Sequence, residues 1–407
     1  MATKKQKISN VPNLRFPGFE GEWTKMNLEK ASEKINSGKT PLGGESTYTT
    51  EGVVFIRSQN VNRDKLELNN TVFISDEVNN SMKNSVVRAN DILLNITGAS
   101  LGRSCVVPPD FETGNVNQHV CIIRLKDGYN PRFIQPVLSS SKGQSIFLSL
   151  QTGSGREGLN FESIKSIELD FPRKGEQDKI ARFLALIDQR IETQNKIIEQ
   201  LETLMQGLRV KVFTQKMRFR DDDGGEFAEW EGKTLGDVAE ITMGQSPESN
   251  SYNTEGVGMP LIQGNADITN RKSNPRNYTS DPTKICEIGD IILTVRAPVG
   301  ATAKSYHKAC IGRGVCSIKN NSKSTIEFLY QYLLDYEPKW VRLEQGSTFT
   351  AISGSDIRSI EIAIPSVEEQ TKIANLLSAI DEKIEAEKKI LVQYEVLKRY
   401  LLQNLFI

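Results

Sequence analysis

Residues 171–192 read FPRKGEQDKIARFLALIDQRIE, and residues 364–385 read IPSVEEQTKIANLLSAIDEKIE. The second stretch repeats the first at a constant offset. The shared positions include Pro172/Pro365, Glu176/Glu369, Gln177/Gln370, Ile180/Ile373, Ala181/Ala374, Leu184/Leu377, Ile187/Ile380, Asp188/Asp381 and Ile191/Ile384. Self-similarity of this kind predicts an internal duplication, and therefore two related halves in the fold.

Weaker echoes extend the duplication toward the N-terminus. They are Trp23 and Trp230, residues 90–94 and 289–293, Val120-Cys121 and Val315-Cys316, and Gly153-Ser154 and Gly346-Ser347. Between these anchors the copies diverge, and residues 57–80 share almost nothing with residues 263–285. A common scaffold that carries two different loop sets is typical of a protein with two different ligand sites.

Composition limits the class of protein. A chain of 407 residues predicts about two to three domains. The mean hydropathy is −0.40, and no apolar run approaches membrane length. The N-terminal MATKKQKISN lacks the apolar segment of a secretory signal, so we expect a cytoplasmic protein without a membrane partner. The five cysteines form no CxxC pair, which favours reduced thiols over disulfides or a zinc site.

The net charge is zero, with 51 basic and 51 acidic residues. A basic excess is the usual mark of a nucleic-acid binder, so this balance weighs against one, although charge can be segregated between faces. Local basic clusters occur at Arg271, Lys272 and Arg276, and at Arg209, Lys211, Lys216, Arg218 and Arg220. Most such runs are solvated surfaces.

The pattern of apolar residues predicts an α+β fold with two β-rich domains. Within residues 22–172, strands are expected at 53–57, 91–96, 105–107, 120–125 and 164–169, with helical spacing over 131–150. Residues 1–21 form an N-terminal arm. Residues 217–365 form a linker (217–225) and the second domain.

Residues 173–216 and 366–407 are each expected to form a long helix with a heptad seam. Both seams contain a polar residue at the same step, Gln194 in one and Glu387 in the other. We predict that the helices, roughly 50–60 Å long, form an antiparallel coiled coil in which these two residues fix the register. Ser366-x-x-Glu369 is typical of a capping box at the start of the second helix.

The familiar catalytic motifs are missing. Ser37-Gly38-Lys39-Thr40 resembles the end of a phosphate loop, but Glu33 stands where the first glycine is needed. The two histidines have no partner motif, residues 153–158 fit no dinucleotide fingerprint, and no Asn/Asp-Pro-Pro-aromatic methyltransferase motif occurs. A recognition protein is favoured, while a nuclease with scattered acidic residues stays open.

The candidate ligand surface consists of the loops that correspond between the two copies. Their polar side chains suit base edges and phosphates, and the same residue types also form ordinary turns. The candidates for DNA contact are Lys39, Thr40, Arg57, Gln59, Asn60, Thr97, Ser100, Arg103, Asn117, Gln118, Ser154, Arg156, Gln245, Ser246, Gln263, Asn265, Arg271, Lys272, Arg296, Arg313, Ser347 and Thr348. Arg296 is the candidate for guanine readout, and Arg271 and Lys272 are candidate phosphate clamps.

The chain resembles the specificity subunits of type I restriction-modification systems over essentially its whole length. The resemblance rests on LRFPGFEGEW at 14–23, on its echoes at 217–219 and 229–230, and on the doubled helix entry. Residues 37–41 and 244–247 also match the family's early loop. The second copy departs from the pattern at residues 221–224, where DDDG replaces Pro17-Gly18.

The resemblance implies two target-recognition domains that each read one half of a bipartite site in double-stranded DNA, with the helices as spacer and docking site for two methyltransferase subunits. It also implies that this chain binds no cofactor and is not itself an enzyme. S-adenosylmethionine, ATP and Mg²⁺ would belong to the methyltransferase subunits and to the restriction/translocase subunits of the full complex. Two alternatives remain: a stand-alone DNA methyltransferase or nuclease, and a coiled-coil scaffold that binds only proteins.

Overall fold

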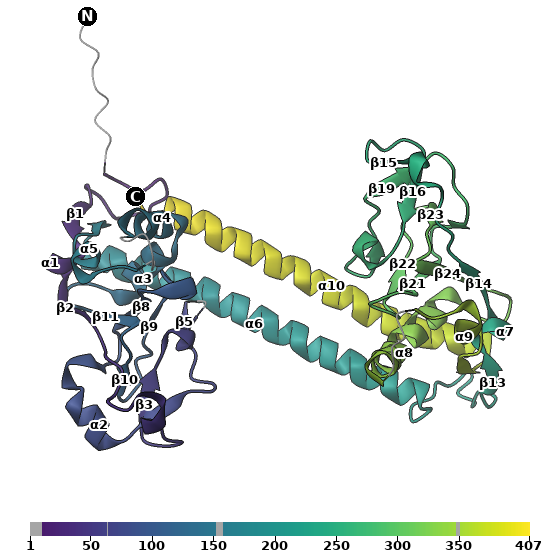
Figure 1. The fold of residues 1–407 in the computed structure, drawn as a ribbon, viewed down its shortest axis with the longest axis horizontal. Coiled ribbons are helices and arrows are strands. Elements are labelled where there is room, and N and C mark those ends of the chain that lie inside the picture. Colours follow the sequence, from purple (N-terminus) through teal and green to yellow (C-terminus); the bar gives the residue numbers. More distant parts are fainter. Residues whose placement is uncertain (1–9, 63, 152–157, 347–350) are drawn as a thin grey trace, which may run out of the picture. The chain divides into compact units, whose positions relative to one another are not determined.

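The computed structural model describes residues 10–62, 64–151, 158–346 and 351–407. The chain divides into two compact units (Figure 1). Unit 1 comprises residues 1–193 and 391–407, and unit 2 comprises residues 194–390. Two long helices, α6 (Lys174–Phe213) and α10 (Val367–Asn404), each contribute residues to both units.

Unit 1 contains an antiparallel sheet, a second sheet with one parallel pair, and two two-stranded ladders. The first sheet has the order β2 (Ser32–Ser37), β11 (Val120–Leu125), β8 (Ile92–Asn95), β9 (Ser104–Val106). The second has the order β6 (Val72–Ile74), β3 (Val53–Ile56), β10 (Gly114–Val116), β7 (Val86–Val87). The ladders are β1 (Thr24–Asn27) with β12 (Glu168–Phe171) and β4 (Val61–Asn62) with β5 (Lys65–Leu66). Its shorter helices are α1 (Leu28–Ala31), α2 (Asp76–Ser81), α3 (Pro131–Ser139), α4 (Ser141–Leu150) and α5 (Phe161–Lys165).

Unit 2 repeats this plan. One sheet has the order β14 (Ala239–Met243), β24 (Val315–Asn320), β21 (Ile291–Thr294), β22 (Thr302–Lys304), β18 (Lys272–Ser273), β17 (Ile268–Thr269). The other has the order β15 (Tyr252–Asn253), β19 (Asn277–Thr279), β16 (Met259–Ile262), β23 (Ala309–Ile311), β20 (Ile285–Cys286). The remaining elements are β13 (Glu231–Thr234) paired with β25 (Glu361–Ile364), α7 (Leu235–Val238), α8 (Ile326–Gly346) and α9 (Gly354–Arg358). The shared strand orders confirm the duplication.

Two predicted elements of the first copy differ from the structure. The expected strand 164–169 is the end of α5 followed by β12, because Asn160 Oδ1 accepts from the N–H of Ser163 (2.7 Å) and starts a helix there. The expected helix 131–150 is interrupted at Ser140, whose hydroxyl caps α4. In unit 2 one continuous helix, α8, stands in place of α3 and α4.

The repeated glutamate holds the start of each long helix. Arg15 donates from Nε and Nη2 to Glu176, both at 2.8 Å, and Arg218 donates in the same way to Glu369, both at 3.0 Å. Glu176 is 2% exposed and Glu369 is fully buried. Only half of the expected capping box forms: Ser366 Oγ accepts from the N–H of Glu369 (3.3 Å), while the Glu369 carboxylate binds the arginine.

The repeated glutamine joins the same helix start to two other elements. Gln177 Nε2 donates to the carbonyl of Pro172 and Gln370 Nε2 to that of Pro365, each at 2.9 Å. Their Oε1 atoms accept backbone N–H groups just before α3 (Asn130) and α8 (2.8–2.9 Å). These bonds satisfy polar groups that would otherwise be buried without partners. The sequence repeat therefore preserves the junction between each domain and its helix.

The two long helices pack antiparallel. In unit 2, Arg209 contacts Asp381 (3.4 Å) and Glu202 contacts Lys388 (2.8 Å), so contacts advance along α6 as they recede along α10. The seam residues Gln194 and Glu387 meet: Gln194 Nε2 donates to the Glu387 carboxylate and to its carbonyl (3.2 Å). That they fix the register stays a prediction.

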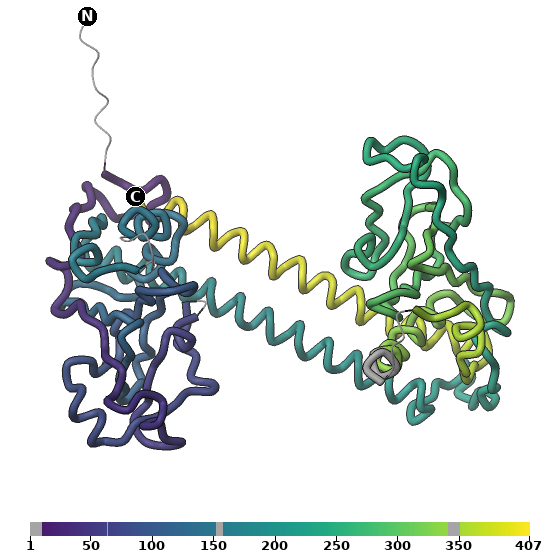
Figure 2. Tube along the Cα trace, in the orientation of Figure 1, coloured from purple at the N-terminus to yellow at the C-terminus, as the bar shows by residue number. Residues whose placement is uncertain are grey.

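Unit 1 is closed by the end of α10 and the residues that follow it. Leu401, Leu405 and Phe406 lie in the same apolar cluster as Phe133, and the Phe133 and Phe406 rings are 5.3 Å apart. Figure 2 shows this last stretch of the chain returning to the N-terminal part. The core of unit 1 therefore combines the first half of the chain with its last residues.

Candidate nucleic-acid interface

A glycine positions the first loop of each unit. The N–H of Gly38 donates to the carbonyl of Asn117 (3.1 Å), and that of Gly244 donates to Val315 (3.0 Å). A Cβ on Gly38 would lie 1.5 Å from the carbonyl oxygen of Val116, and one on Gly244 would lie 2.1 Å from a neighbouring carbonyl oxygen. Any other residue would force the loops apart. The two early loops that match in sequence are therefore held in the same way.

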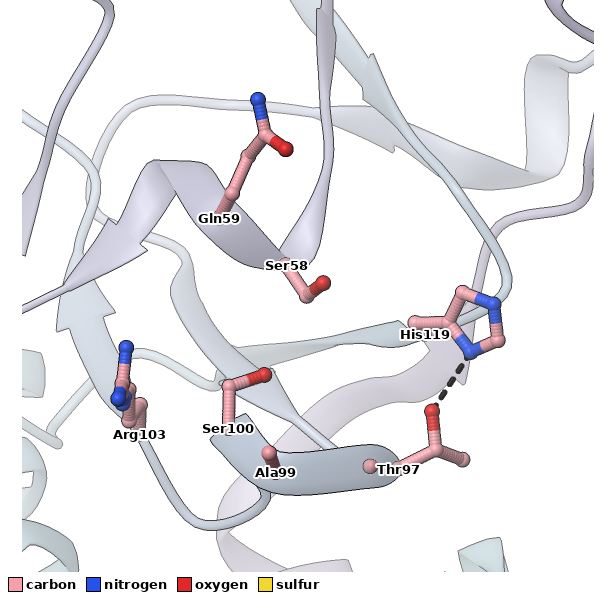
Figure 3. Close-up of a pocket in the computed structure, with 8 residues that line it drawn as sticks. Ser58, Gln59, Thr97, Ala99, Ser100, Arg103 and His119 are labelled. Atoms are coloured by element: carbon pink, nitrogen blue, oxygen red, sulfur yellow. Dashed lines mark hydrogen bonds between the residues drawn. The ribbon is translucent and has the colours of Figure 1, made fainter.

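In unit 1 several predicted residues surround a hollow of about 430 Å³ (Figure 3). The short helices η2 (Ser58–Asn60) and η4 (Gly98–Ser100) border it. Its lining residues are Ser58, Gln59, Thr97, Gly98, Ala99, Ser100, Arg103 and His119. Gln59 and Arg103 are exposed beside the hydroxyls of Ser58 and Ser100. The structure thus brings together four of the predicted contacts, which are Gln59, Thr97, Ser100 and Arg103.

His119 also lines this hollow, although it was not among the predicted contacts. Its Nδ1 lies 2.6 Å from Thr97 Oγ1, and its Nε2 lies 3.1 Å from Gln118 Nε2. Both ring nitrogens of His119 are therefore engaged by neighbouring side chains, and the tautomer decides which of them donates. Thr40 in turn donates to Gln118 Oε1. Four side chains from three loops therefore form one hydrogen-bonded network.

Other predicted residues border the site or support it. Asn117 Oδ1 accepts from the N–H of His119 (3.1 Å), and Lys39 is exposed next to Thr40. Asn60 is 2% exposed, and its amide accepts from the N–H of Arg57 and donates to Glu67 (2.9 Å each). Asn60 therefore shapes the loop and presents no free amide to a ligand in this structure.

Unit 2 presents a different set of groups on the corresponding loops. Arg296, Arg313, Gln245 and Asn265 are exposed. Ser246 Oγ accepts from the N–H of Arg313 (3.1 Å), which joins the early loop to the loop before β24. Gln263 Nε2 donates to the hydroxyl of Tyr252 (3.0 Å). Two exposed arginines, Arg296 and Arg313, lie on these loops, whereas the lining of the hollow in unit 1 contains one, Arg103.

Three of the basic candidates contact an acidic or aromatic side chain of the same chain. The Arg271 guanidinium binds Glu337 through two hydrogen bonds (2.7 and 2.9 Å). Lys272 Nζ lies 5.0 Å from the centre of the Tyr306 ring, and the Arg57 guanidinium lies 5.7 Å from that of Tyr48. The phosphate-clamp role of Arg271 and Lys272 stays a prediction. Four further candidates, Ser154, Arg156, Ser347 and Thr348, lie outside the described residues.

The cysteines are not available as reactive groups on the loops. All five are buried, and burial raises the pKa of the Cys105, Cys121 and Cys316 thiols to about 12. Within the described part of the chain, no three His, Cys, Asp or Glu residues gather as they would around a metal ion. Nor does any helix there have the length and apolarity to cross a bilayer.

The family described as "Type I restriction modification DNA specificity domain" matches residues 20–203 and again 228–395. The chain belongs to the type I restriction-modification specificity subunits. A curated relative, the putative type I restriction enzyme MjaX specificity subunit of Methanocaldococcus jannaschii, is 31% identical over 99% of this chain and 95% of its own length. The EcoBI specificity subunit of Escherichia coli is 30% identical over 52% of this chain and 44% of its own length.

Solved structures share the fold of this specificity subunit. The S subunit from M. genitalium aligns with a TM-score of 0.63 at 18% identity, covering 98% of this chain and 99% of that one. A chain described under complex assembly and conformational transition of the type I R-M system aligns with a TM-score of 0.62 at 24% identity, covering 94% and 97%. The two family matches fall on the two copies of the duplicated scaffold.

Proposed function

We propose that this chain is the sequence-specific DNA-binding subunit of a type I restriction-modification complex, and that the loops of each unit read one half of a bipartite site in double-stranded DNA. The observation that carries the proposal is the repetition of one scaffold with two different loop sets. Two copies that bind the same ligand are expected to keep similar loops, whereas residues 57–80 and 263–285 share almost no sequence.

The side chains on the loops suit base readout of two kinds. In unit 1, Gln59 and the Thr97–His119–Gln118 network present amide, hydroxyl and ring groups that match adenine and other base edges. In unit 2, the exposed Arg296 and Arg313 offer the paired donors that suit guanine O6 and N7. We infer that the two half-sites differ in base composition.

The long helices supply the second part of the proposed function. Two methyltransferase subunits dock on α6 and α10, and these partners carry S-adenosylmethionine. Restriction/translocase subunits, with ATP and Mg²⁺, join the full complex in the cytoplasm. The chain itself is proposed to be non-catalytic, because the family to which it belongs is one of specificity subunits.

The test compares this chain alone with the chain plus its methyltransferase subunits, using DNA and labelled S-adenosylmethionine. We expect methyl transfer only in the complete mixture, at sites with two defined blocks. Methyl transfer by the purified chain alone would support the enzyme alternative. Normal methylation at the same sites without this chain would leave only a protein-binding scaffold role.

A further inference from the structure

Each unit contains a short hairpin that begins directly after a short helix with a proposed base-reading residue. These helices, η2 in unit 1 with Gln59 and η6 (Asn265–Asp267) in unit 2 with Asn265, are called the reading segments. In unit 1, η2 runs into β4 and β5, and Asn60 closes the hairpin base by accepting from the N–H of Glu67 (2.8 Å). In unit 2, η6 runs into β17 and β18, and Asp267 accepts from the N–H of Asn274 (2.7 Å). The two segments share almost no sequence, yet they are built alike.

In unit 1 the tip of this hairpin binds the long helices. Asp64, at φ 64°, accepts from Gln135 Nε2 of α3 (2.9 Å) and contacts Lys398 Nζ of α10 (3.4 Å). Lys398 also binds Asp188 of α6 (2.8 Å). The next residue of the hairpin, Lys65, pairs with α6 through Glu192 (2.9 Å). The tip is therefore fixed to both long helices and to α3.

In unit 2 the tip carries the opposite charge. Arg271, at φ 58°, binds Glu337 of α8 in a bidentate ion pair and donates to the carbonyl of Thr302 (3.2 Å). Glu337 also accepts from the N–H of Thr302 (2.8 Å). The helix α8 is in turn tied to both long helices, because its Gln331 binds Arg209 (2.9 Å) and Asp381 (2.7 Å). Asp381 is the repeat counterpart of Asp188.

We propose that each hairpin tip is a latch that fixes the adjacent reading segment to the helical part of its own unit. Because Asp64 and Arg271 carry opposite charges, neither tip residue can replace the other, and in this sense the two latches are unit-specific. This inference rests on the proposed function. A reading segment that is latched meets DNA at one angle, so the complex accepts one gap between half-sites. A released segment can swing, so neighbouring gap lengths become acceptable while its base-reading groups stay the same.

The first experiment uses the full chain assembled with its methyltransferase subunits and a DNA library in which the gap varies. We expect Lys398→Met and Asp64→Asn to keep both half-site sequences and to reduce the preference for the native gap over gaps changed by one base pair. The reduction should be roughly fivefold, which corresponds to the upper end of the range for ion pairs at a protein surface. Lys398→Arg keeps the charge and should retain the preference.

Lys308→Met is the matched control, because it removes an ion pair (Glu287, 2.7 Å) that is remote from the hairpin tips in sequence and is half-exposed on both sides. It should leave the gap preference unchanged. Asp64→Asn is the milder latch variant, since an amide oxygen can still accept from Gln135, and it serves if Lys398→Met fails to assemble. A folded latch variant with a lowered melting temperature and an unchanged gap preference would overturn the proposal.

The second experiment tests the opposite charges. Asp64→Arg places the unit 2 tip residue beside Lys398, and Arg271→Asp places the unit 1 tip residue beside Glu337. Each should broaden the gap preference more than its neutral counterpart, Asp64→Asn or Arg271→Gln. Equal effects would refute the unit-specific claim. If the wild-type complex shows no two-block site at all, the proposed function fails, and this result is distinct from a failure of the latch.

Discussion

Replacing Leu405 and Phe406 together by alanine should unfold unit 1 and leave unit 2 folded. Leu405 is 1% exposed and Phe406 is 8% exposed, and both belong to the apolar cluster of unit 1. Truncation of such side chains costs about 2–5 kcal/mol for leucine and about 3–5 kcal/mol for phenylalanine. The two are neighbours and share contacts, so the sum is not fully additive, and we expect a loss of about 4–8 kcal/mol. A domain is stable by only about 5–15 kcal/mol.

Hydrogen-exchange mass spectrometry on the isolated full chain measures the two units separately. We expect strands β8 and β11 of unit 1 to lose protection, while β21 and β24 of unit 2 keep it. Val392→Ala with Val396→Ala is the matched control, because these side chains lie on α10, which leads into Leu405, and are 55% and 50% exposed. Their replacement should change stability by less than about 0.5 kcal/mol. Wild-type protection of unit 1 in the Leu405/Phe406 variant would refute the discontinuous core.

Three further perturbations have definite outcomes. Inserting four residues after Gly207 adds about 6 Å of helix, which equals one to two base-pair rises of about 3.4 Å. Sequencing of methylated sites should then show a longer gap between unchanged half-sites, and an unchanged gap in an active variant would contradict the spacer role. Replacing both Gln194 and Glu387 by isoleucine should raise the melting temperature at neutral pH, because a polar pair in an apolar seam costs stability. Hydrogen bonds from Lys383 and Gln194 hold the pKa of Glu387 below its usual range. The stability that these contacts give is therefore present above the pKa of Glu387 in the unfolded chain, and it is lost as the pH falls through the lowered pKa of the folded chain. The melting temperature of the wild-type chain should fall more on acidification than that of the double variant, and an equal fall in both would count against this assignment. Gly38→Ala and Gly244→Ala should each weaken recognition of one half-site only, measured by binding to DNA with single half-site changes; equal weakening of both half-sites by either variant would argue against separate reading units.

The repeat and the helix pair were predictable because both leave periodic marks in the sequence. The heptad seams indicated two long helices, and the structure places Gln194 against Glu387 as their equivalent steps suggested. The repeat itself did not reveal why Glu176 and Gln177 recur. Their partners, Arg15 and the carbonyl of Pro172, became evident only when the tertiary contacts were known.

Other features could not be predicted, either because the element is very short or because the contact joins residues far apart in the sequence. A five-residue helix such as α5 leaves too short an apolar pattern to be distinguished from a strand. His119 has no motif around it, and its role depends on Thr97, which lies 22 residues away. The Arg271–Glu337 pair likewise spans 66 residues, so a run of basic residues read as a phosphate clamp gave no sign of it.

The central claim is that one chain reads two independent half-sites. The most direct test is to map methylated sites for the complex that contains Arg296→Ala, beside the wild-type complex. The account predicts a two-block site for the wild type, and a variant site in which one block loses about 1–3 kcal/mol of discrimination at a guanine while the other block is unchanged. A single continuous block in the wild type, or equal weakening of every position in the variant, would contradict it.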